Sequence, residues 1–245
     1  MPTSPPPPTE APRRPFKGRR PLTPRERALV TELFGPSFDP DRVVIWVDGP
    51  LTLGIPKVIL DTLYVPREWG GKPMLDEHGA FVPEREHVFV HESVHLWQHQ
   101  RGGRAYLGES VGAMLASYAR GEGRQGAYRW SRAYDAGLDW SRWNPEQQAA
   151  AVEWWFLCRE RQTKRVSAED AAVWAERLSP LLERLRAGDG APRRSPWGAA
   201  LFGGLGVAVG VAVGLLLGET LTAPEVTLGV AAGLGGVVAG RWGWG

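Results

Sequence analysis

The chain has 245 residues but only one cysteine, Cys158. A single thiol excludes an internal disulfide framework and a zinc site built from several cysteines. Residues 1–20 lack the apolar stretch of a secretory signal, so we do not expect export by that route. These residues carry a local charge of +4, whereas the whole chain carries +2, so the remainder is slightly acidic. We therefore expect no nucleic acid among its partners.

Proline and glycine are concentrated at the two ends of the chain. Nine of the 21 prolines fall in the first 24 residues, and 14 of the 31 glycines follow Pro196. This distribution predicts a disordered Pro- and Arg-rich leader at 1–20 and a folded domain at 21–187. It further predicts a linker at 188–197 and a separate Gly-rich segment at 198–240.

Local patterns in the central segment predict an α+β domain that is mainly helical. Thr23, Asn144 and Ser167 each stand where a side chain can cap the start of a helix. The runs 43–47 and 57–65 are rich in β-branched residues and predict a small β-hairpin or meander. We expect six tryptophans to pack in the core of this domain: Trp130, Trp140, Trp143, Trp154, Trp155 and Trp174.

Four histidines recur at intervals of four residues: His87, His91, His95 and His99. On a helix they form one stripe, and only neighbouring members can share a ligand. The HExxH pattern that begins at His91 places two imidazoles one turn apart, with Glu92 facing a water molecule at the metal. We expect His91 and His95 to bind Zn²⁺, because apolar neighbours bury this helix and two unpaired buried histidines would be unfavourable. His87 and His99 are interpreted as hydrogen-bonded polar residues.

A catalytic zinc site of this kind needs a third protein ligand. No histidine follows His99, which excludes the third histidine of the metzincin pattern. The third ligand is therefore expected to be a carboxylate from a later helix. Glu109, Glu146 and Glu153 are the candidates, and the residue pattern alone does not choose among them.

Three stretches together resemble a known family: LTPRERALVTELFG, VFVHESVHLWQHQRGG, and GAYRW followed by WNPEQQAAAVEWWF. They resemble the zincin-like Vgr-related family, metallopeptidase domains found beside bacterial contractile injection and type VI secretion genes. The resemblance covers about residues 21–158. It implies that Glu146 is the third ligand, in a gluzincin-type His-His-Glu site. It also implies injection-system components as partners.

The expected chemistry is zinc-assisted hydrolysis of a peptide or protein substrate. Glu92 would accept a proton from water and pass it to the leaving amine. Tyr106, Tyr128 and Tyr134 are the candidates for stabilising the negative charge that develops on the carbonyl oxygen.

The C-terminal segment predicts a membrane anchor. Residues 198–218 carry no charged side chain and are long enough to cross a bilayer, and a shorter uncharged run follows at 226–240. Arginines lie outside the two runs and glutamates lie between them, which predicts a transmembrane helical hairpin with both ends in the cytoplasm. Glycines spaced by four residues form a glycine-zipper pattern and favour homo-oligomerisation.

Two functions from different classes fit these features. The first is a zinc metallopeptidase that a C-terminal hairpin tethers to membrane lipid, with its zincin-like domain in the cytoplasm. The alternative is a membrane-inserting effector or structural component, delivered by a contractile injection or type VI secretion system, whose zincin domain is a scaffold. A soluble protein that oligomerises through the Gly-rich segment is a third interpretation.

Overall fold

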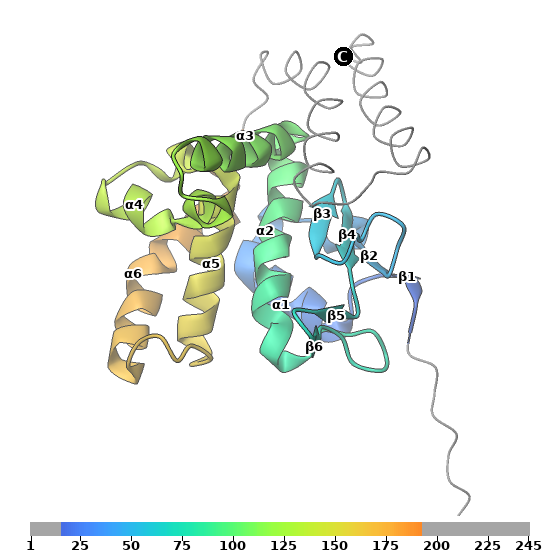
Figure 1. The fold of residues 1–245 in the computed structure, drawn as a ribbon. Helices are drawn as coiled ribbons and strands as arrows, with labels where there is room; N and C mark the ends of the chain where they lie inside the picture. The colour runs from blue at the N-terminus through green and yellow to red at the C-terminus, as the bar shows by residue number, and fades with distance from the viewer. Residues whose placement is uncertain (1–15, 193–245) are drawn as a thin grey trace, which may run out of the picture.

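The computed structural model describes residues 16–192, which form an α+β fold of helices packed around a small sheet (Figure 1). The expected class is therefore confirmed for this part of the chain. The predicted membrane hairpin at 198–240 lies outside the described residues. Within residues 16–192, no helix has both the length and the apolar composition that a membrane crossing requires.

The main sheet has four strands in the order β1-β2-β4-β3. Strand β2 pairs antiparallel with β1 and parallel with β4, and β3 and β4 form an antiparallel hairpin. Strands β5 and β6 form a separate two-stranded antiparallel sheet. The strands are β1 (Gly18–Arg20), β2 (Val44–Val47), β3 (Lys57–Ile59), β4 (Thr62–Val65), β5 (Glu68–Trp69) and β6 (Lys72–Pro73).

The sheet differs from the sequence prediction in two respects. The β-hairpin lies within residues 57–65 and not between the two predicted strands, because the chain turns at Leu60 (φ +58°). Residues Gly18–Arg20 belong to the predicted disordered leader, yet they pair with β2. The Arg20 guanidinium fixes them further, since it donates to both carboxylate oxygens of Glu26 at 2.6 and 2.7 Å. Neither partner of this ion pair can be inferred from local pattern.

The helices begin where the capping residues predict. Thr23 and Asn144 each accept a hydrogen bond from the backbone of the third helical residue, and both helices start with a capping box. Ser167 also caps the last helix, since its side chain accepts from the backbone of Asp170. The helices are α1 (Pro24–Phe34), α2 (Glu86–Gly102), α3 (Ala105–Ala119), α4 (Trp130–Asp135), α5 (Pro145–Arg159) and α6 (Ala168–Arg186). Short 3-10 turns occupy 35–37, 40–42, 83–85, 124–128 and 140–142.

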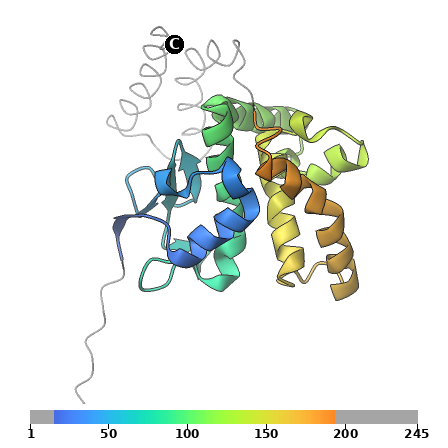
Figure 2. The same cartoon turned by 180° about the vertical axis from the view of Figure 1, so that it is seen from behind.

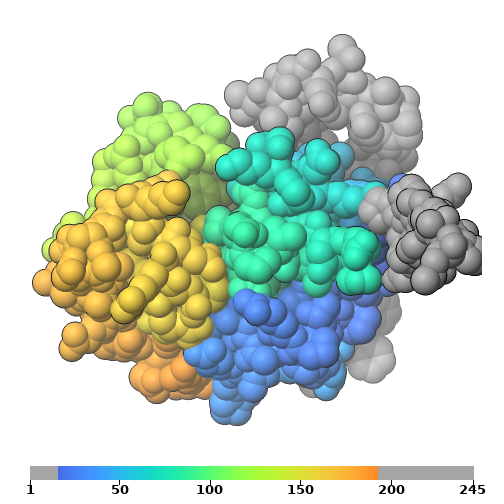
Figure 3. Space-filling model, turned by 90° about the horizontal axis from the view of Figure 1, so that it is seen from below, coloured from blue at the N-terminus to red at the C-terminus, as the bar shows by residue number. Residues whose placement is uncertain are grey.

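Helix α2 runs through the middle of the molecule (Figure 1). The sheet lies on one side of it and α5 on the other, with α6 beyond α5 and α3 across one end. From behind, α1 lies between the sheet and the helices (Figure 2). From below, the yellow-to-orange α5 and α6 lie beside the green-blue start of α2 (Figure 3). This arrangement encloses α2 and buries most of the HExxH segment.

One apolar core joins the sheet to the helices. Trp97, on the face of α2 turned toward α1, is fully buried, and its Nε1 donates to Ser37 Oγ at 2.9 Å. Ser37 Oγ also lies 2.6 Å from the carbonyl oxygen of Leu185 at the end of α6. The six predicted core tryptophans are all in or against this core, with Trp140, Trp143 and Trp155 buried and Trp130, Trp154 and Trp174 half-buried. The prediction for the tryptophans is therefore confirmed.

Candidate metal centre

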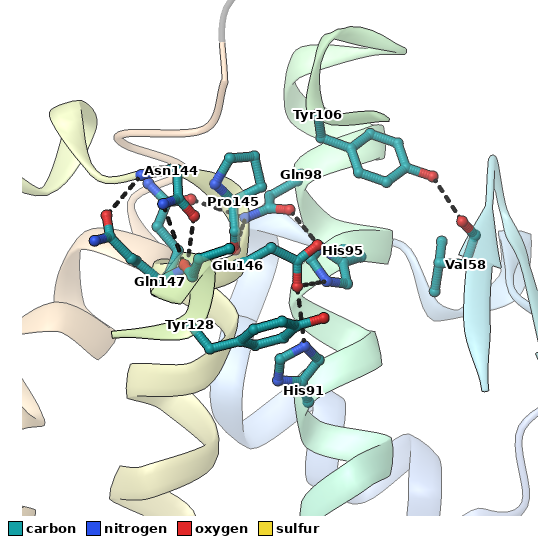
Figure 4. A network of polar contacts seen from close by, with 12 residues as sticks. Val58, His91, His95, Gln98, Tyr106, Tyr128, Asn144, Pro145, Glu146 and Gln147 are labelled. Atoms are coloured by element: carbon teal, nitrogen blue, oxygen red, sulfur yellow. Dashed lines mark hydrogen bonds and ion pairs between the residues drawn. The ribbon is translucent and has the colours of Figure 1, made fainter. Parts of the chain in front are cut away.

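The structure brings together the two HExxH histidines and one of the three candidate carboxylates. His91 and His95 lie one turn apart in the middle of α2, and Glu146 lies in the first turn of α5. All three side chains are buried, and one ligand atom from each lies within 4.8 Å of the other two (Figure 4). This buried His-His-Glu group could hold a metal ion.

The spacing of the three atoms fits a small tetrahedral ion. Glu146 Oε2 lies 3.6 Å from His91 Nε2 and 3.5 Å from His95 Nε2. Zinc bonds of about 2.0–2.1 Å in a tetrahedron place two ligand atoms roughly 3.3–3.4 Å apart. Hydrogen bonds between nitrogen and oxygen are shorter, at about 2.7–3.2 Å. The observed distances are therefore closer to those of a ligand set than to those of a direct hydrogen bond.

Glu153 sets the proton position on His91. Its Oε2 atom lies 3.0 Å from His91 Nδ1, and its Oε1 atom lies 2.9 Å from His87 Nδ1. Burial pushes the pKa of Glu153 upward, but the bonds to the two histidines outweigh it and lower this pKa to about 2. An ionised carboxylate only accepts, so His91 donates from Nδ1. Its Nε2 lone pair is then free to face Glu146.

Gln98 has the same effect on His95. Its Nε2 amide group donates to the carbonyl oxygen of Pro145 at 3.1 Å and to Gln148 Oε1 at 2.9 Å. A carbonyl only accepts, so the amide orientation is fixed and Gln98 Oε1 faces His95 Nδ1 at 2.8 Å. His95 therefore donates from Nδ1 and keeps the Nε2 lone pair for a metal.

Three acceptors consequently converge on one point: two imidazole lone pairs and the carboxylate of Glu146. Burial lowers the pKa of both histidines, but the contacts of His91 with Glu146 and Glu153 and the charge of Glu146 beside His95 outweigh it, so both pKa values are raised. Burial also favours a neutral Glu146, yet the two histidines hold its pKa well below the usual range. Such a group is stable only with positive charge at its centre, supplied by protons on the histidines or by a metal cation.

Glu92 lies between the two histidines in sequence and is close enough to both of them, and to Glu146, for their charges to act on it. Its side chain is buried, and it lines a cavity of about 110 Å³ together with His91, Arg124 and Glu153. Burial raises the pKa of Glu92 and the charges of nearby His95 and His91 oppose the rise, with a net increase. A carboxylate with a raised pKa beside a metal site is suited to accept and return a proton.

Two tyrosines flank the histidine pair (Figure 4). The ring of Tyr128 stacks on His91 with a centroid distance of 5.8 Å, and Tyr106 stacks on His95 at 6.0 Å. The Tyr106 hydroxyl donates to the carbonyl oxygen of Val58 and so is occupied. Burial raises the pKa of Tyr128, whose hydroxyl accepts from Arg124 and keeps its own proton to donate.

Tyr134 was the third candidate for stabilising negative charge, and it lies elsewhere. Its ring packs against Trp130, Trp143 and Trp174. Tyr134 does not line the small cavity at Glu92. Within residues 16–192, the structure records no contact between Tyr134 and His91 or His95. Of the three tyrosines, Tyr128 is placed best for the predicted role.

The other sequence candidates have different places. Glu109 is an exposed residue on α3 and is not part of the His-His-Glu group. Glu153 accepts a hydrogen bond from His91 Nδ1, the nitrogen that faces away from Glu146, and so orients the ring of a candidate ligand. His87 is hydrogen-bonded to Glu153, as predicted for it. His99 instead has its Nε2 atom 3.8 Å from Asp61, an ion-pair distance longer than a hydrogen bond.

Sequence reasoning did not identify the residues that orient the ligands. Gln98 follows His95 by three residues, and Glu153 follows Glu146 by two turns, so each lies on the same helix face as a ligand. These two spacings are the only sequence signal that points to Gln98 and Glu153 as residues that orient a ligand. The contact of Glu153 with His91, and the groups of α5 that fix the Gln98 amide, depend on the packing of α5 against α2.

The chain matches no protein-family model, no curated protein and no solved structure with which it was compared. The resemblance drawn from the sequence therefore stays an expectation. The geometry of the buried His-His-Glu group is the ground on which a function can be proposed.

Proposed function

We propose that the protein is a zinc-dependent metallopeptidase with a gluzincin-type site. His91, His95 and Glu146 would hold the ion, and Glu92 would be the general base. The observation that carries this proposal is the convergence of two Nε2 lone pairs and one carboxylate beside Glu92. Two imidazoles and a carboxylate are a ligand set typical of catalytic zinc.

When bound, zinc polarises the scissile carbonyl and lowers the pKa of a water molecule. Glu92, which lines the small cavity beside His91, would accept a proton from a water molecule and donate it to the leaving amine. Tyr128 donates its hydroxyl proton toward the carbonyl oxygen as negative charge develops there, while Arg124 orients the tyrosine. Glu153 and Gln98 hold the two imidazole rings in the required tautomer.

The membrane tether is part of the proposal and rests on the sequence of residues 198–240. It places the protein at a membrane with the zincin-like domain in the cytoplasm, and the glycine-zipper spacing supports assembly of several copies. In the alternative, the zincin domain is an inert scaffold in an effector or structural part of an injection system. That alternative predicts a metal site without cleavage.

The test is metal analysis and peptide cleavage with the full chain. We expect about one zinc per chain, and we expect Glu92→Gln to keep the metal while cleavage of a mixed peptide library falls by about 10²–10⁴-fold. Glu109→Gln is the matched control, because Glu109 is an exposed carboxylate outside the site. Stoichiometric iron in place of zinc would overturn the metal assignment. Unchanged cleavage by Glu92→Gln would overturn the mechanism.

A further inference from the structure

A larger cleft lies next to the candidate metal centre. It has a volume of about 610 Å³ and shares His87 and Glu153 with the small cavity that Glu92 lines. Tyr128, which stacks on His91, also lines it. A chain bound in this cleft would therefore contact Glu153 and Tyr128, which both touch the candidate ligand His91. In Figure 3 the light-green segment before α5 and the yellow-to-orange connection from α5 to α6 lie on one face of the molecule.

The charge of this cleft is strongly one-sided. Arg129, Lys164 and Arg165 line it, and none of them has an ion pair with another residue of the described part of the chain. The single carboxylate in its lining is Glu153, which accepts from His87 and His91. We call the cavity lined by Arg129, Lys164 and Arg165 the basic cleft. Its three cations are available to a ligand.

The apolar part of the basic cleft is held firmly in place. Trp130 lines it and packs edge-on against Trp174 of α6 at a centroid distance of 5.5 Å. Trp154 and Leu157 line it from α5, one turn apart. These side chains offer a rigid surface to the stems of bound residues, while the cations lie around it. The combination favours an extended peptide over a bare inorganic anion.

We propose that the basic cleft binds a peptide segment rich in Asp or Glu and thereby sets the substrate preference of the metal centre. Carboxylate side chains would pair with Arg129, Lys164 and Arg165, and charge complementarity would guide the segment to the site. The preference for acidic substrates rests on the proposed peptidase function. Binding of the acidic segment to the basic cleft does not depend on that function.

Binding and cleavage are therefore tested separately, with the full chain in nonionic detergent. The probes are fluorescein-labelled hexapeptides of alternating Ala and Glu, or of alternating Ala and Lys. Glu92→Gln is the host for anisotropy titrations, because substitution of the general base prevents turnover. We expect the Glu peptide to bind at least about tenfold more tightly than the Lys peptide at low salt. We expect the difference to shrink as the salt concentration rises, because exposed charges are screened.

Charge reversal locates the binding. The double substitution K164E/R165E should weaken binding of the Glu peptide at least about tenfold. The matched control, K17E/R142E, makes the same change in net charge at exposed residues that do not line the basic cleft, and it should change binding less than about twofold. Circular dichroism and thermal melting would confirm that both variants are folded. Equal binding of the two peptides, or an equal loss in both double variants, would overturn the proposal.

Cleavage by the wild-type chain then separates the two proposals. Binding of the Glu peptide that depends on Lys164 and Arg165, without any cleavage, would leave the basic cleft standing and count against the peptidase. Cleavage of a mixed library with no enrichment of Asp or Glu near the cut would support the peptidase and count against the basic cleft as the source of substrate preference. Enrichment that disappears in K164E/R165E would support both.

Discussion

Glu153 and His91 are joined by a hydrogen bond of 3.0 Å between Oε2 and Nδ1. Glu146, two turns earlier on α5, faces the Nε2 atom of the same ring. The two carboxylates of one helix face therefore act on opposite nitrogens of one imidazole. Glu146 could therefore serve as a metal ligand, and Glu153 is the acceptor that leaves the Nε2 lone pair free.

The role of Glu153 predicts a graded loss of zinc affinity. Glu153→Leu removes the acceptor but keeps most of the side-chain volume, so zinc should still bind but about 10–100-fold more weakly. Glu146→Leu removes a proposed ligand and should lower the zinc affinity more than Glu153→Leu does. Competition with a chromophoric chelator measures both affinities, and Glu109→Leu serves as the control. A larger loss at Glu153 than at Glu146 would show that their roles are reversed.

Tyr128 should affect turnover more than binding. Its hydroxyl keeps a proton and lies beside the histidine pair, so Tyr128→Phe should lower kcat by about 10²-fold with zinc content unchanged. Tyr134→Phe removes a hydroxyl from an aromatic cluster away from the site and should leave kcat within about twofold. Steady-state kinetics on one cleaved peptide compare the two variants. Equal effects would exclude a specific role for the Tyr128 hydroxyl.

Zinc should stabilise the protein more as the pH rises. In the zinc-free chain, burial opposes protonation of His91 and His95, but Glu146 and Glu153 beside His91, and Glu146 beside His95, outweigh it and raise both pKa values. A raised pKa stabilises the fold fully below the unfolded value of about 6.5, and this contribution is lost as the pH rises through the folded pKa. Zinc binding requires the same nitrogens to be deprotonated. The zinc-free chain should therefore lose stability where zinc binds best.

Calorimetry at fixed free zinc checks this coupling. The difference in Tm between zinc-loaded and zinc-free protein should grow between about pH 6 and about pH 8. In a His95→Ala variant the difference should be small at every pH. A Tm difference that shrinks with rising pH in the wild-type chain would contradict the assignment of the two histidines as ligands.

Gly190 links the end of the described chain to the site through Gln148. The Gly190 carbonyl accepts from Gln148 Nε2 at 2.8 Å, and Gln148 in turn accepts from Gln98. A Cβ added at Gly190 would lie 2.2 Å from the ring of Trp140, and the residue has φ +80°. This packing places Gly190 in the folded domain, whereas the sequence assigned it to a linker.

Two glycine substitutions separate backbone strain from packing. Gly121 has φ +71° but open space around it, so Gly121→Ala should cost about 1 kcal/mol of unfolding free energy. Gly190→Ala adds a clash with Trp140 and should cost about 1–3 kcal/mol more. Urea denaturation measures both. Equal costs would show that Gly190 does not pack closely on Trp140.

The sequence by itself determined the features that depend on neighbours along the chain. The capping residues Thr23, Asn144 and Ser167 place helix starts correctly, because a cap bonds a backbone group only a few residues away. The spacing of His91 and His95 likewise follows from one helical turn. The strand pairing was only partly predictable, since the partner of β2 at Gly18–Arg20 lies in a segment whose composition suggests disorder.

The tertiary structure decided which carboxylate completes the site. Glu109, Glu146 and Glu153 all lie on helices and are equivalent by residue type. The packing of α5 against α2 brings Glu146 to the Nε2 atoms and Glu153 to Nδ1, while Glu109 is left exposed on α3. Contacts between segments more than 40 residues apart depend on how whole helices pack, which no local pattern records.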